Sequence, residues 1–398
     1  MKALDIKNID KTNWKKYRFE EISASISERV EPGETDLDIY VGLEHLDAES
    51  LHIKRTGVPS DVSGTKLKVY KGDLIFGKRR AYQRKASIAH FDGICSAHAM
   101  VLRAKEKVID PKLFPFFIHS DYFMHRAIDI SVGGLSPTIN WGTLKNQEFL
   151  LPPIDQQAKL SELLWAADDV VEKYKILKEN ISLNNQIFTF NTYSNPSKDS
   201  FIEIELLELV IKKYGIVDGP FGSNLKTIHY KKEGVPIMQS SFVTKGYFRE
   251  TERLYVDEEK YKEQIRSSVK SYDILMAKIG ANYGECAIVP EYYDRAILAG
   301  NSLKISPDNN KCNTKYLLYY LKYIKSIGVL EKLVTTTAQP ALSIAALKKL
   351  KLKVLKDLKL QENVVKRIEH FNSLTRETSN TLRVLNTLQK QLINQIFS

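Results

Sequence analysis

Apolar residues recur at coiled-coil spacing in two long stretches of the chain, residues 155–190 and 360–397. In the first stretch they alternate at steps of three and four, with Asn184 as one polar position that can fix the register. A helix that packs on a single globular core usually shows a wider apolar face, so the pattern favours a coiled coil. The proposed seam residues are Leu160, Leu163, Val170, Leu177, Ile181, Ile368, Phe371, Leu385 and Leu392.

Each long helix follows a body of about 150 residues in which short β-rich runs alternate with glycines. Strands are expected at residues 39–41, 73–76, 235–238 and 274–276, and helices at 111–130 and 316–323. We therefore expect a mixed α/β (α+β) fold. Its predicted segments are globular domains at 1–154 and 199–357, a helix with its linker at 155–198, and a second helix at 358–398.

The two halves repeat one another. The run at residues 71–78 returns 200 positions later at 271–278, Pro137 returns 203 positions later as Pro340, and Gln157 returns 204 positions later as Gln361. This indicates a duplicated body-plus-helix unit with an internal pseudo-twofold repeat. An isolated helix with such a seam is poorly stable, so the two helices are expected to pair antiparallel within the chain.

The net charge of +11 and the pI near 9.2 favour a polyanionic partner, although a merely basic protein is the simpler alternative. Three widely spaced cysteines disfavour a disulfide framework or a zinc site and fit a reducing cytoplasm. No stretch approaches 18 consecutive apolar residues, and the N-terminus lacks the apolar core of a signal peptide, so no membrane contact is expected.

Motifs that carry chemistry are absent from the sequence. It contains no phosphate-binding glycine loop, no His-Glu-x-x-His, no Gly-x-Ser-x-Gly and no Asn/Asp-Pro-Pro-Tyr/Phe tetrapeptide of adenine methyltransferases. Lone histidines such as His45, His98 and His229 are better explained as structural or surface residues. We therefore predict no catalytic residue, no metal site and no cofactor in this chain.

A basic cluster directly follows the expected strand at residues 73–76. Five cations occur among eight residues, interleaved with an aromatic side chain and an amide, and such side chains can contact phosphates or base edges. The alternative is an ordinary solvated surface. The candidate DNA-binding residues are Lys78, Arg79, Arg80, Tyr82, Gln83, Arg84 and Lys85.

Small polar residues beside glycines form three weaker candidates in the second body. Glycine lets a backbone approach a ligand closely, and amide or hydroxyl groups can read base edges, but ordinary loops are rich in the same residues. The candidate residues are Ser223, Asn224, Lys226, Gln239, Ser240, Lys278, Asn282 and Tyr283.

Over almost its whole length the sequence resembles the specificity subunits of type I restriction-modification systems. The resemblance rests on residues 40–46, 77–85 and 91–96 in the first half, on 218–226 and 234–237 in the second, and on the helix entry at 151–157. It implies two target-recognition domains, each reading half of a split double-stranded DNA site, with the helices setting the gap. It also implies two docked adenine methyltransferase subunits and further restriction subunits, to which S-adenosylmethionine, ATP and magnesium would belong.

Two other function classes remain open at this stage. One is a self-contained modification or nicking enzyme whose site has no recognised motif. The other is an adaptor or scaffold not linked to restriction, in which the coiled coil joins two chains and the basic face meets nucleic acid or an acidic protein.

Overall fold

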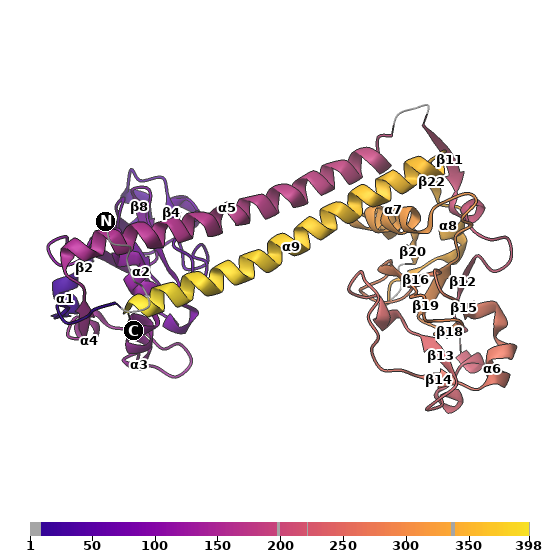
Figure 1. Ribbon diagram of the computed structural model, residues 1–398, viewed down its shortest axis with the longest axis horizontal. Coiled ribbons are helices and arrows are strands. Elements are labelled where there is room, and N and C mark those ends of the chain that lie inside the picture. The colour runs from indigo at the N-terminus through magenta and orange to yellow at the C-terminus, as the bar shows by residue number, and fades with distance from the viewer. Residues whose placement is uncertain (1–8, 197–199, 221, 336–338, 398) are drawn as a thin grey trace. The chain divides into compact units, whose positions relative to one another are not determined.

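The structure is a computed structural model that describes residues 9–196, 200–220, 222–335 and 339–397, without the side chain of Ser223. The chain forms two compact units (Figure 1). The first comprises Met1–Leu177 and Thr378–Ser398, and the second comprises Lys178–Glu377. Among the described residues, no helix has the length and apolar character needed to span a membrane.

The described residues of the first unit form two four-stranded sheets and a separate strand pair. In the antiparallel sheet, Leu74 and Phe76 face one apolar cluster and Ile75 faces another, because successive side chains point to opposite faces. The antiparallel sheet has the order β2 (Ser23–Ile26), β9 (Met100–Ala104), β6 (Leu74–Phe76), β7 (Ala86–Ile88). The other has the order β3 (Arg29–Val30), β5 (Lys66–Val69), β8 (Gly93–Cys95), β4 (Tyr40–Val41), and β1 (Lys15–Arg18) pairs with β10 (Glu148–Leu151).

Aromatic residues fill the core of the first unit, where Phe117 lies 5.2 Å from Phe149 and 5.5 Å from Phe397 between ring centroids. The helix expected over 111–130 is in fact two helices. The break falls at Ser120, whose backbone is extended and whose hydroxyl accepts a hydrogen bond from the Phe123 amide at 3.2 Å. The short helices are α1 (Phe19–Ile22), α2 (Phe114–His119), α3 (Asp121–Asp129) and α4 (Trp141–Leu144).

The second unit repeats this arrangement of sheets but places its extra edge strand differently. Its antiparallel sheet has the order β12 (Ile216–Asp218), β19 (Ser302–Ile305), β16 (Ile274–Ala277), β17 (Cys286–Ile288). Its other sheet has the order β14 (Tyr255–Val256), β13 (Val235–Met238), β18 (Ala296–Leu298), β15 (Ser268–Val269), and β11 (Phe201–Glu205) pairs with β22 (Lys351–Leu355). Here the extra edge strand, β14, joins β13, whereas in the first unit the extra strand, β3, joins β5.

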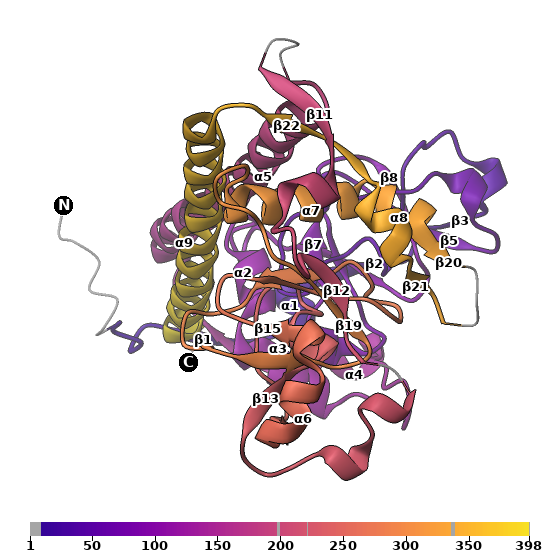
Figure 2. The ribbon, with the colours of Figure 1, turned by 90° about the vertical axis from the view of Figure 1, so that its right-hand side faces the viewer.

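Helix α7 (Thr314–Ser326) includes the expected helical stretch at 316–323 and supplies tyrosines to the second core. Tyr193 stacks on Tyr320 with 4.4 Å between ring centroids. Figure 2 shows α6 (Glu258–Glu263) beside β13, where Tyr261 packs against the cluster that includes Val235. The second unit also contains the short helix α8 (Ile344–Lys348) and the strand pair β20 (Val334–Thr335) and β21 (Ala341–Leu342).

Buried hydrogen bonds show the duplication at atomic detail. The Gln157 amide oxygen accepts from the Asp110 amide at 2.7 Å, and its nitrogen donates to the carbonyls of Val108 and Pro152. In the second unit the Gln361 oxygen accepts from the Asn313 amide at 2.7 Å, and its nitrogen donates to the Leu355 carbonyl at 2.8 Å. Each glutamine therefore fastens its long helix to the body that precedes it.

Left-handed backbone positions also recur 200 residues apart. Glycine occupies this region at no steric cost, whereas a residue with a side chain is strained there by roughly 1–2 kcal/mol. The second unit uses glycine at two of the three positions, and the first unit uses arginine at the same two. The pairs are Gly72 and Tyr272, Arg80 and Gly280, and Arg84 and Gly284.

The two long helices, α5 (Ile154–Tyr193) and α9 (Leu358–Phe397), lie side by side and antiparallel in each unit (Figure 1). In the first unit the Gln389 amide donates to Asp168 at 3.0 Å, and in the second unit the rings of Phe188 and Phe371 are 6.1 Å apart. The mixed α/β fold with an antiparallel helix pair within the chain is confirmed.

The predicted seam is wrong in the middle of α5. Val170 and Leu177 are 40% and 46% exposed, and Asn184 is also exposed. The helix instead turns Leu164, Asp168 and Val171 inward. Reading apolar residues alone missed this register, because polar side chains with hydrogen-bond partners occupy inward positions.

The other proposed seam residues fit the packing to different degrees. Leu160, Ile181 and Ile368 are buried. Leu163, Phe371, Leu385 and Leu392 are half-buried.

Candidate nucleic-acid interface

Two loops meet at the end of β6 in the first unit. The Arg80 amide donates to the Pro137 carbonyl at 2.8 Å, and the Ile139 amide donates to the Lys78 carbonyl at 2.9 Å. The Arg80 guanidinium also donates to the Ser136 hydroxyl at 3.2 Å. The loop containing Pro137 therefore holds the basic cluster in a defined conformation.

Part of the basic cluster faces solvent. Arg79 and Arg80 are exposed, Tyr82 is 54% exposed, and Gln83 is half-buried. These side chains form a surface that can meet phosphates and base edges. Lys78 is half-buried in a neighbouring pocket, and burial, followed by the charge of Arg29, lowers the pKa of its ammonium group.

Arg84 has partners within the fold, and this geometry does not favour its predicted role as a DNA contact. Its guanidinium pairs with Asp121 at 2.6 Å and with Glu49 at 3.2 Å, and it donates to the His119 carbonyl at 2.6 Å. Burial lowers the pKa of His119 to about 4, so the ring is neutral and its Nε2 donates to the Ala86 carbonyl.

Lys85 is likewise held inside the fold, because its ammonium donates to the Leu43 carbonyl at 2.6 Å. Sequence reasoning could not separate the exposed cations from the anchored ones. The partners of Arg84 and Lys85 lie more than 30 residues away in the chain.

The equivalent loops of the second unit meet through the same backbone bonds. The Gly280 amide donates to the Pro340 carbonyl and the Leu342 amide donates to the Lys278 carbonyl, both at 3.0 Å. The Lys278 ammonium is buried and pairs with Asp218 at 2.7 Å, so its geometry does not favour the predicted DNA contact.

The other candidates of the second unit divide in the same way. Ser240 is buried at the start of a 3-10 turn, Tyr283 packs against the core, and the Gln239 amide donates to the Glu252 carbonyl at 2.9 Å. The Ser223 side chain lies outside the described part of the chain. The exposed candidates are Asn224, Lys226 and Asn282.

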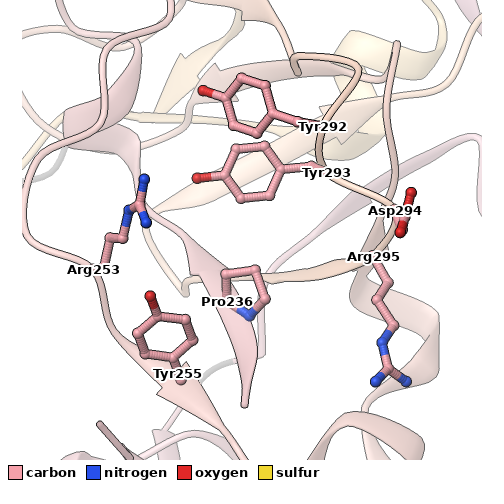
Figure 3. Close-up of a pocket in the computed structure, with 7 residues that line it drawn as sticks. All are labelled: Pro236, Arg253, Tyr255, Tyr292, Tyr293, Asp294 and Arg295. Carbon is pink, nitrogen blue, oxygen red and sulfur yellow. The ribbon is translucent and has the colours of Figure 1, made fainter. Parts of the chain in front are cut away.

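A pocket of about 330 Å³ in the second unit was not predicted. The rings of Tyr292 and Tyr293 are 4.9 Å apart, and Tyr292 is 67% exposed. Arg253 pairs with Glu250, and Arg295 pairs with Glu258 at 2.8 Å. Figure 3 shows the lining residues, which are Pro236, Arg253, Tyr255, Tyr292, Tyr293, Asp294 and Arg295.

Tyrosine and arginine occur close together at 253–255 and again at 292–295, which was the sequence signal for this pocket. Exposed tyrosine rings can stack on bases, which adds an aromatic candidate surface to the second unit.

The described residues contain no group of three or more His, Cys, Asp or Glu side chains placed to hold a metal ion. Cys95, Cys286 and Cys312 are free and buried, and burial raises the pKa of each thiol to about 12. Their thiols therefore stay protonated and pack as small apolar groups.

Comparison with known families identifies the class of protein. The type I restriction modification DNA specificity domain matches the chain twice, over residues 43–201 and 222–387. The chain therefore belongs to this family.

Two relatives and one solved structure illustrate the similarity. The chain is 28% identical over 168 residues to the type I restriction enzyme EcoDI specificity subunit of Escherichia coli, a match that covers 40% of this chain and 37% of that subunit. It is 22% identical over 312 residues to the putative type I restriction enzyme MjaX specificity subunit of Methanocaldococcus jannaschii, covering 71% of this chain and 69% of that one.

The solved structure comes from work on complex assembly and conformational transition of the type I R-M system. It shares the fold with a TM-score of 0.62 at 18% identity, over 97% of this chain and 98% of that one.

Proposed function

We propose that this chain is the DNA specificity subunit of a type I restriction-modification complex. Each unit would read one half of a bipartite double-stranded DNA site. The observation that carries the proposal is the double family match, because each matched segment contains one of the two equivalent loop pairs. The exposed Arg79 and Arg80, together with the net charge of +11, support a polyanionic partner.

The same proposal assigns the chemistry to partner subunits. Two adenine methyltransferase subunits would dock on the long helices, and restriction subunits would join them. S-adenosylmethionine, ATP and magnesium would bind to those partners in the cytoplasm. This chain would determine which DNA sequence the complex recognises, without a catalytic residue of its own.

Exposed apolar side chains on α5 support docking along the helices. In the second unit, Leu183, Ile187 and Phe190 are 54%, 48% and 53% exposed, and their steps of four and three place them on one helical face. Exchanging all three for glutamine would weaken co-purification of a methyltransferase subunit. Unchanged recovery would argue against this surface.

The paired helices would also set the spacer between the half-sites. Matched insertions of seven residues in α5 and α9 keep the register of a heptad pattern. The methylated motif of such a variant is expected to gain spacer length while both half-sites stay the same, and altered half-sites would contradict this role.

The overall function is tested by mapping adenine methylation in a host that carries this chain with its methyltransferase partner, and in a matched strain without the chain. Loss of one bipartite methylated motif is the expected result. An unchanged map, in a strain whose methyltransferase is active, would support the adaptor alternative instead.

A further inference from the structure

A pocket of about 310 Å³ opens beside the basic loop of the first unit. It lies between β2, β3, the start of β5 and the loop that follows β6. Fourteen residues line it, and none of them is an aspartate or glutamate. The polar and aromatic residues that matter for its chemistry are Ser27, Arg29, Lys66, Lys78, Asn140 and Trp141.

Three cations share this pocket, but only one of them is held by the fold. The Lys66 ammonium donates to the carbonyls of Ser63 and Gly64. Within the described part of the chain, neither the Arg29 guanidinium nor the Lys78 ammonium has a hydrogen-bond or ion-pair partner. A half-buried ammonium without an anion is costly, and the lowered pKa of Lys78 is consistent with that cost.

In the second unit a carboxylate neutralises the equivalent lysine. Lys278 is the repeat of Lys78, and its ammonium pairs with Asp218 at 2.7 Å. The same carboxylate accepts from Arg266 at 3.1 Å. Asp218 therefore places a carboxylate between two cations of the second unit.

Strand register identifies the residue at the position of Asp218 in the first unit. Ile26 lies opposite Val101, which itself lies opposite Ile75. Val217 lies opposite Lys304, which itself lies opposite Leu275. Since residues 75 and 275 are equivalent, Ile26 corresponds to Val217, and the next residue, Ser27, corresponds to Asp218.

The extra cation of the first unit comes from a strand without a counterpart at that edge. Arg29 lies on β3, which pairs with β5 through Leu67. In the second unit the edge next to β15 carries no such strand among the described residues. At the equivalent place the first unit thus has Ser27 instead of a carboxylate and carries the additional guanidinium of Arg29.

We propose that Arg29 and Lys78 bind a phosphate group of the DNA backbone in this pocket, and that the second unit has no equivalent phosphate site because Asp218 occupies it. The proposal rests on the proposed function, since the phosphate belongs to the DNA that the first unit reads. Arginine and lysine form charge-assisted bonds with phosphate oxygens, and such contacts fix the register of a protein on its duplex.

The sharpest test places the carboxylate of the second unit into the first. In Ser27→Asp, the new carboxylate would pair with Lys78 and repel a phosphate. Ser27→Asn is the matched control, because asparagine has nearly the shape of aspartate but carries no charge. Ser27 is exposed, so both variants are expected to fold, and circular dichroism checks this. Fluorescence anisotropy of the full chain with its methyltransferase partner measures Kd for the bipartite duplex across salt concentrations.

We expect Ser27→Asp to raise Kd about tenfold and to reduce the slope of log Kd against log salt by about one, as the loss of one phosphate contact predicts. Ser27→Asn should stay within about twofold of the wild type. The double variant Arg29→Ala, Lys78→Ala should match Ser27→Asp. Equal affinity and slope in all four proteins would overturn the pocket assignment.

Two further results keep this test separate from that of the overall function. A wild-type complex that does not distinguish the bipartite duplex from random DNA would defeat the proposed function itself. If inorganic phosphate raises the melting temperature of the DNA-free wild type but not of Ser27→Asp, while DNA binding is equal in both, the pocket takes a free anion and the DNA assignment is wrong.

Discussion

The two units keep the same framework and differ in the charges around it. In the first unit Lys78 and Arg29 face an open pocket, whereas in the second unit Lys278 is paired with Asp218. Both units nevertheless keep a buried glutamine at the start of the long helix and the same backbone bonds between the loops. Duplicated halves can therefore diverge in what they contact while the hydrogen bonds that hold the loops stay fixed.

The two units also differ at two positions where the backbone is left-handed. The second unit has Gly280 and Gly284 where the first has Arg80 and Arg84. Strain at such positions persists where the side chain has a role. Arg84 anchors the loop through Asp121 and Glu49, and Arg80 reaches the Ser136 loop with its guanidinium.

The largest expected effect comes from Arg84→Ala. This change removes a largely buried guanidinium together with its contacts to Asp121, Glu49 and the His119 carbonyl, and hydrogen bonds that involve a charged group contribute about 1.5–3 kcal/mol each. Urea unfolding should show this loss in the first unit. A loss below about 1 kcal/mol would mean that the unit does not depend on the anchor, as the second unit does not at Gly284.

The two glutamine anchors should differ by one hydrogen bond. Gln157→Ala removes three hydrogen bonds and Gln361→Ala removes two. Each change leaves buried backbone groups unpaired, so we expect losses of about 2–4 kcal/mol, with the larger loss at Gln157. The exposed Gln186→Ala is the matched control, and an equal effect of all three in thermal unfolding would reject the anchoring role.

Arg80→Gly should separate stability from binding. The change brings the first unit to the second unit's residue and removes left-handed strain, which should raise the free energy of unfolding by about 1 kcal/mol. DNA affinity should fall in the same protein because an exposed cation is lost. A variant that is both less stable and unchanged in affinity would contradict both parts.

The smallest effect concerns a pH-dependent contact found in the first unit. His52 Nε2 lies 2.6 Å from the Asp168 carboxylate on α5, and this hydrogen bond raises the pKa of His52 above its ordinary value. Because the pKa of His52 is higher in the folded than in the unfolded protein, the protonated pair stabilises the fold. This stabilisation is fully present below the pKa of unfolded histidine, about 6.5, and is lost as the pH rises through the pKa of the folded state.

We therefore expect His52→Gln to lower the free energy of unfolding by less than about 1 kcal/mol, because the pair is partly exposed. This loss should occur only at pH values below the folded-state pKa of His52, where the ring is protonated. Unfolding measured from pH 5 to 9 checks this. A difference between the proteins that stays constant across the whole range would exclude protonation as its cause.

Much of the fold was predictable because its signals are local. The 200-residue repeat, the strands such as β6 and β16, and the two long helices all follow from apolar periodicity and turn residues near in sequence. The strands and long helices were found where the sequence placed them, and the division at Ser120 was missed because its extended backbone interrupts a continuous apolar pattern.

The candidate site was less predictable because its contacts are remote in sequence. The buried Asp168 on α5 bonds to His52 and Gln389, which lie 116 and 221 residues away. Arg84 looked like a DNA contact until its partners Glu49 and Asp121 were placed around it. The Tyr292 pocket combines three separate segments, so its shape exists only after folding.

The central claim is that each unit reads one half of the DNA site. Its most direct test exchanges residues 15–151, from β1 to β10, for the matching segment of another family member and maps adenine methylation with the methyltransferase partner present. We predict that one half of the bipartite motif changes while the other half stays. A motif that changes in both halves, or in neither, would contradict the claim.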